Sequence, residues 1–107
     1  MELPAPYRAF QSAYPEVWQA YDRLGAALHG WGPLDTKTRE LVKLGIAVGA
    51  RTEGAVHAHA RLARQAGATP EELRHVVLLA LTTIGFPSMM AARTWVEDIL
   101  APDRADR

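Results

Sequence analysis

The chain has 107 residues, with twelve basic and twelve acidic side chains, no cysteine and a hydrophobic fraction of 49%. This length suits one domain around a single core. The balanced charge provides no field to attract nucleic acid or an anionic membrane, so we expect neither as a partner. The lack of cysteine excludes disulfides, thiolate metal sites and mechanisms that use a cysteine nucleophile or redox pair in this chain.

The start of the chain shows no targeting pattern. Residues 1–6 lack the basic-then-apolar layout of a signal peptide, and no later stretch reaches the roughly 20 apolar residues of a membrane span. We therefore expect a cytoplasmic protein. Residues 1–14 contain prolines and no sustained hydrophobic period, which predicts an arm or a short irregular helix. The domain itself is expected to span residues 15–101, followed by a charged tail at residues 102–107.

Hydrophobic periodicity predicts helices in the rest of the chain. Apolar residues recur every three or four positions from Val17 to Leu28, and Pro15 and Gly30 suit the two ends of that helix. The next helix has a charged start and then an apolar run, Leu41–Val48, which should be buried on several sides. The predicted helices cover residues 15–30, 36–49, 52–66, 70–84 and 88–100.

Helix start and stop signals place the boundaries. Asp35 or Thr36 suits the cap of the second of these helices and Thr52 the cap of the third, which should stop at Gly67. The segment Thr69-Pro70-Glu71-Glu72 combines a capping threonine, proline at the first helical position and glutamate three residues after the cap. The sequence therefore predicts an all-α domain of about five to six helices with short loops.

Four features follow one another in a fixed order between Asp35 and Leu100. They are an Asp-x-x-x-Arg-Glu-Leu helix start at residues 35–41, a histidine at position 59, Gly-Ala-Thr-Pro-Glu-Glu-Leu at residues 67–73 and Gly-Phe-Pro at residues 85–87. In order and spacing they resemble the carboxymuconolactone decarboxylase family, which includes the alkylhydroperoxidase D-like proteins. The resemblance implies the alkylhydroperoxidase D-like helical fold and assembly as a homo-oligomer, a trimer or a hexamer.

The resemblance also implies a site. Peroxidase-like members of the family have a glutamate followed by Cys-x-x-Cys-x-x-x-His. Carried onto this chain, the glutamate falls on Glu40, the histidine on His59 and the two cysteines on Thr52 and Ala55. Without the thiols a cysteine-based hydroperoxide reduction is excluded. The lactone decarboxylases of the family, which work without that pair, are the nearer analogy.

On this analogy His59 and Glu40 are the predicted catalytic residues. Histidine exchanges protons near neutral pH, and a hydrogen-bonded glutamate would orient the ring and stabilise its cationic form. In a decarboxylation this proton would quench the enolate left after carbon dioxide departs. The expected substrate is a small carboxylated lactone or keto acid, with no cofactor. Thr52, Ala55 and Arg51 are the predicted substrate-binding residues, Arg51 because it could hold an anion just before the helix start.

Each of these residues also has a structural explanation. Glu40 could be a first-turn glutamate favoured by the helix dipole, and His59 a partly buried histidine satisfied by backbone or water. His57 lies two residues from His59 and should point to nearly the opposite side of the helix, so the His-x-His pair is a poor metal site and no metal is expected. His57 is expected to face solvent or a neighbouring subunit.

Two other classes of function stay open. One is a non-catalytic ligand-binding or structural homo-oligomer, which is compatible with the same Glu40 and His59. The other is an interaction module that works through Trp31 and the apolar loop around it.

Overall fold

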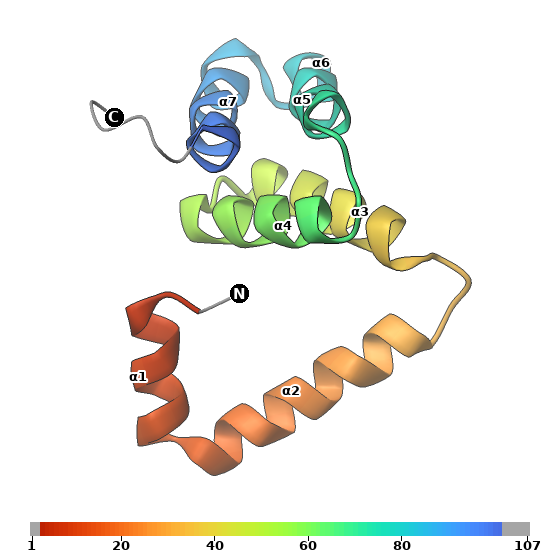
Figure 1. Ribbon diagram of the computed structural model, residues 1–107. Coiled ribbons are helices and arrows are strands. Elements are labelled where there is room, and N and C mark those ends of the chain that lie inside the picture. The colour runs from red at the N-terminus through yellow and green to blue at the C-terminus, as the bar shows by residue number, and fades with distance from the viewer. Residues whose placement is uncertain (1–2, 102–107) are drawn as a thin grey trace. The chain divides into compact units, whose positions relative to one another are not determined.

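The computed structural model describes residues 3–101, and within this range it contains seven helices and no strand (Figure 1). The predicted all-α class is therefore confirmed. None of these helices is both long and apolar enough to cross a membrane. The helices are α1 (Ala5–Ala13), α2 (Pro15–Gly30), α3 (Thr36–Ala50), α4 (Glu53–Gln65), α5 (Pro70–Leu79), α6 (Leu81–Ile84) and α7 (Phe86–Leu100).

The chain divides into two compact units at Pro33 and Leu34. The first contains α1 and α2. Here α1 is a regular nine-residue helix where an arm or a short irregular helix was expected, and α2 has the predicted bounds. Aromatic contacts join the two helices, with the ring centroids of Phe10 and Trp18 6.3 Å apart. Neither helix has a buried residue.

The second unit, described over residues 34–101, contains the core. Helices α3 and α4 pack against each other, and α7 packs on both α4 and α5 (Figure 1). Small and branched apolar side chains fill the space between them, which lets the helix axes come close. The buried apolar residues are Leu44, Ala47, Val48, Val56, Ala60, Ala63, Ala68, Leu73, Val77, Met89, Ala92 and Val96.

The apolar run of α3 is buried on one side only. Leu44 is fully buried, but Val42 is 47% exposed and Ile46 65% exposed. In the single chain, the prediction that this run is buried on several sides is therefore wrong. Its apolar residues exceed what one helix face can hold, and the excess lies on the surface.

The helix starts follow the predicted signals at two of three positions. Asp35 caps α3 by accepting a hydrogen bond of 2.8 Å from the Thr38 backbone N–H. Thr69 and Glu72 form the complete capping box of α5. Thr52 holds the N-cap position of α4 but makes no capping hydrogen bond; its hydroxyl donates to the Ala50 carbonyl at 3.4 Å.

The predicted helix at residues 70–84 is interrupted at Ala80. The Thr83 hydroxyl donates to the Leu79 carbonyl, while the Thr83 backbone N–H bonds the Ala80 carbonyl. A threonine hydroxyl bonded to the carbonyl four residues earlier often bends a helix, although the same bond from Thr94 to Met90 leaves α7 unbroken. The break predicted around residues 85–87 is narrower than expected: α7 begins at Phe86, directly after Gly85 with its φ of 94°.

Candidate functional site

Glu40 and His59 face each other across the contact between α3 and α4. The distance from His59 Nδ1 to Glu40 Oε1 is 2.8 Å, although the residues are 19 positions apart in the chain. The Glu40 side chain is 6% exposed and the His59 ring 25% exposed. The helices that carry them are held together by fully buried neighbours one turn away, Leu44 on α3 and Val56 on α4. The core therefore fixes the separation of the pair.

The hydrogen bond sets the roles of the two ring nitrogens. An ionised carboxylate only accepts hydrogen bonds, so with Glu40 ionised Nδ1 of His59 carries the hydrogen and donates it. A charge as deeply buried as Glu40 requires such a partner, because an unpaired carboxylate in this place would be strongly destabilising. The second nitrogen, Nε2, is then the atom of the partly exposed ring that can exchange a proton with another molecule.

Arg51 and Thr52 form the turn between α3 and α4. Arg51 has φ 58° and ψ 40°, which makes it the one residue other than glycine in the left-handed region among residues 3–101. The Thr52 N–H bonds the Ala47 carbonyl and the Arg51 N–H bonds the Val48 carbonyl, which is a Schellman motif. Both side chains are exposed. The turn thus places an arginine at the surface one residue before the N-cap of α4.

Ala55 lies one helical turn before His59 on α4 and is partly buried against the core. Two cavities of residues 34–101 lie elsewhere. One of about 400 Å³ runs between α3, α5 and α6, and one of about 170 Å³ lies between α5 and α7. Glu40, His59, Arg51, Thr52 and Ala55 line neither of them. The His59 ring, 25% exposed, is the part of the pair that reaches the surface.

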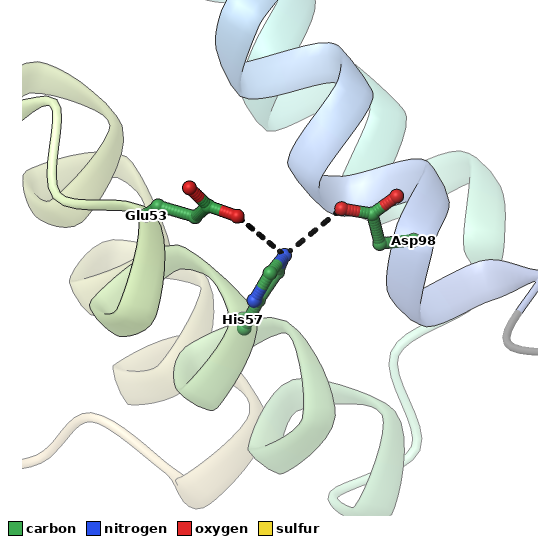
Figure 2. Close-up of side chains that lie close together, drawn as sticks. All are labelled: Glu53, His57 and Asp98. Atoms are coloured by element: carbon green, nitrogen blue, oxygen red, sulfur yellow. Dashed lines mark hydrogen bonds and ion pairs between the residues drawn. The ribbon is translucent and has the colours of Figure 1, made fainter. Parts of the chain in front are cut away.

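His57 belongs to a different cluster, shown in Figure 2. Its Nε2 lies 3.1 Å from Asp98 Oδ2 on α7 and 3.9 Å from Glu53 Oε2 one turn earlier on α4. Sequence reasoning missed this cluster. Glu53 and His57 have the spacing of neighbours on one helix face, which is a usable signal. Asp98 is 41 residues away, and only the packing of α7 on α4 brings it there.

Comparison with known proteins shows where the chain belongs. Residues 15–98 match the model of the carboxymuconolactone decarboxylase family. The crystal structure of the apo form of a carboxymuconolactone decarboxylase family protein from Legionella pneumophila is similar, with a TM-score of 0.77 and 29% identity, over 89% of this chain and 85% of that one.

A curated relative, an uncharacterised protein from Haemophilus influenzae, is 51% identical over 47 residues. That match covers 44% of this chain and 42% of the relative, so it spans less than half of either protein. The family model covers most of the present chain, including every residue of the Glu40–His59 pair and its surroundings. The chain therefore belongs to the carboxymuconolactone decarboxylase family.

Proposed function

We propose that this protein carries out acid–base chemistry, decarboxylation or proton transfer, on a small carboxylated lactone or keto acid. The observation that supports this most is the 2.8 Å hydrogen bond between a buried carboxylate, Glu40, and a partly exposed histidine, His59. A histidine oriented in this way is a competent general acid or base near neutral pH. Membership of the carboxymuconolactone decarboxylase family supports this choice of substrate class. We also propose a cytoplasmic location, as expected from the sequence.

In the proposed decarboxylation, the bond between the substrate carbon and its carboxylate breaks and carbon dioxide leaves. The electron pair of that bond moves toward the adjacent carbonyl and forms an enolate. The proton on His59 Nε2 then transfers to the carbon and completes the product, and water returns a proton to the ring. Glu40 acts by holding Nδ1–H and by stabilising the imidazolium before the transfer. No cofactor is needed for these steps.

Three neighbours complete the proposed site. Arg51 would attract the substrate carboxylate, because its guanidinium stands at the exposed turn before α4. Thr52 and Ala55 would border the substrate on the His59 side of α4, since residues three and four apart on a helix share a face. Their small side chains leave room there.

A second candidate function is a non-catalytic ligand-binding or structural homo-oligomer. One observation favours it: the Glu40–His59 pair does not line the cavity between α3, α5 and α6 or the cavity between α5 and α7. In that case the buried Glu40 would serve to hold α3 on α4 through His59.

Self-association is part of both candidates. Large apolar side chains are exposed along α2, among them Tyr21, Leu24 and Leu28, and Ile46 is exposed on α3. Large apolar side chains exposed in this number are typical of a protein that buries them against a partner. We propose a homo-oligomer, a trimer or a hexamer, in which copies of this chain cover these residues.

The test is a screen of small carboxylated lactones and β-keto acids for release of carbon dioxide. With a substrate in hand, we expect His59→Gln to reduce kcat by about 10²–10⁴-fold. His75→Gln, which changes an exposed histidine on α5, is the matched control and should leave the rate unchanged. Unchanged turnover by His59→Gln would sink the catalytic role. Binding of these compounds without turnover would favour the second candidate.

A further inference from the structure

Three side chains outside the Glu40–His59 pair form a mixed nitrogen and oxygen cluster. His57 Nε2, Glu53 Oε2 and Asp98 Oδ2 come from two helices, and one potential ligand atom of each lies within 4.8 Å of the other two. Figure 2 shows the two carboxylates on either side of the imidazole nitrogen. The three side chains differ in exposure: 22% for His57, 29% for Asp98 and 58% for Glu53.

The cluster is held by the core beneath it. Val56, next to His57, and Val96, one half-turn before Asp98, are both fully buried members of the contact between α4 and α7. These contacts fix the two helix backbones at this point. Glu53, the most exposed of the three, is the member that can adjust its position.

The separations suit a small divalent ion. Zinc lies about 2.0–2.2 Å from histidine nitrogen and carboxylate oxygen, so two ligands in a tetrahedral site are about 3.4 Å apart. His57 Nε2 lies 3.1 Å from Asp98 Oδ2, a little less than this ligand separation. It lies 3.9 Å from Glu53 Oε2, a little more than this separation. A small rotation of the exposed Glu53 side chain would bring its oxygen into range.

The charges suit such an ion as well. Two carboxylates and a neutral imidazole carry a charge of −2, which a divalent cation cancels. Imidazole together with carboxylate favours first-row transition ions and zinc over calcium or magnesium, which prefer oxygen ligands alone. We propose that Glu53, His57 and Asp98 bind one Zn²⁺-like divalent ion that connects α4 to α7, with water in the remaining position.

This site is separate from the proposed catalytic pair. His57 and His59 are two residues apart on α4, which turns their side chains to nearly opposite sides of the helix. The two rings accordingly bond different carboxylates, Asp98 for His57 and Glu40 for His59. The expectation of no metal rested on the two histidines as a pair of ligands. The ligand set proposed here uses one of them and two residues that the folded chain brings to it.

The test is zinc binding by the full chain after removal of metal by dialysis against a chelator. Competition with a chromophoric chelator should show one Zn²⁺ per chain, and Co²⁺ should give the visible absorption of a site with a low coordination number. We expect His57→Gln and Asp98→Asn each to weaken zinc binding at least about tenfold. Glu53→Gln should weaken it less. His75→Gln is the matched control and should bind zinc like the wild type.

Circular dichroism of each variant shows whether it is folded, and the melting temperature gives a second readout. Zn²⁺ should raise the melting temperature of the wild type and of His75→Gln but not that of His57→Gln. Equal zinc affinity in the wild type and in both His57→Gln and Asp98→Asn would overturn the proposal. So would a wild type that binds no Zn²⁺ or Co²⁺ in competition with the chelator, in which case the cluster is an ion-pair network between the two helices.

Discussion

Glu40 Oε1 on α3 accepts a hydrogen bond from the ring of His59 on α4 over 2.8 Å, and this contact joins a buried carboxylate to a partly exposed ring. It links the core of the second unit to its surface. The same contact orients the ring for proton transfer and satisfies the buried charge, so removal of either partner affects both chemistry and stability.

Glu40→Gln should change the tautomer of His59. The ionised carboxylate accepts only, which keeps the hydrogen on Nδ1, whereas the amide of glutamine can donate or accept. We expect the ¹⁵N spectrum of the wild type to show the Nδ1–H form when the ring is neutral and that of Glu40→Gln to show a mixture. The His75 ring serves as the internal reference, since its surroundings do not change. The same tautomer in both proteins would contradict the role given to Glu40.

Two N-cap threonines should respond differently to alanine. Thr69→Ala removes a hydroxyl that accepts a hydrogen bond from the Glu72 N–H, so we expect a loss of about 1 kcal/mol in the free energy of unfolding. Thr52→Ala is the matched control: its hydroxyl caps no helix and should contribute much less. Denaturant unfolding of the two variants measures both values. Equal losses would show that residue type matters here more than the hydrogen bond.

Acid should destabilise the fold partly through Glu72. Its hydrogen bond from the Thr69 backbone N–H, and then its contact with Lys37 at 3.0 Å, lower its pKa from the ordinary value of 4.5. A carboxyl group whose pKa is lower in the folded state contributes stability that is present above the unfolded-state pKa and is lost as the pH falls through the folded-state pKa. We therefore expect the stability of the wild type to fall with pH below about 4.5.

The variant Glu72→Gln isolates this contribution. It should be less stable than the wild type at pH 7, and the difference should shrink as the pH falls below 4.5. Glu71→Gln changes the adjacent carboxylate in the same turn, which is 81% exposed, and serves as the control. Chemical unfolding at a series of pH values gives the comparison. A constant difference between Glu72→Gln and the wild type at all pH values would rule out this origin.

Arg51→Gly should stabilise the protein. Glycine adopts the left-handed conformation at this position without the steric cost that Arg51 bears, so we expect a gain of about 0.5–1 kcal/mol, measured by denaturant unfolding. Arg51→Ala keeps the conformational cost and should bring no gain. If Arg51 binds the substrate carboxylate, both variants raise KM. The pair of variants thus separates the backbone role of this residue from its charge.

The exposed apolar face of α2 should mediate self-association. Leu24→Glu places a charge among the exposed apolar residues, and we expect a lower molecular mass in light scattering after size-exclusion chromatography. Arg23→Glu also adds negative charge next to this position and serves as the control for charge alone. An oligomer of the same size in the wild type and in Leu24→Glu would exclude this face from the interface.

Local signals in the sequence were enough to place most helix ends. Thr69, Pro70 and Glu72 predict the start of α5 because a capping box involves only residues within one turn of each other. The interruption of the same helix at Ala80 was not predicted. At this point the Ala80 N–H bonds the Val77 carbonyl and the Thr83 N–H bonds the Ala80 carbonyl, each three residues back instead of four. Such a local change of backbone pattern is not visible in a hydrophobic pattern.

By itself, the sequence determined the all-helical class and the family resemblance, because helical periodicity and capping depend on residues that are close along the chain. It also pointed to Glu40 and His59 through that resemblance. Only the tertiary structure decided the 2.8 Å contact between them, the exposure of Val42 and Ile46, and the meeting of Glu53, His57 and Asp98. These depend on how α3 and α7 pack on α4, and helix packing is set by the fit of side chains from distant parts of the chain.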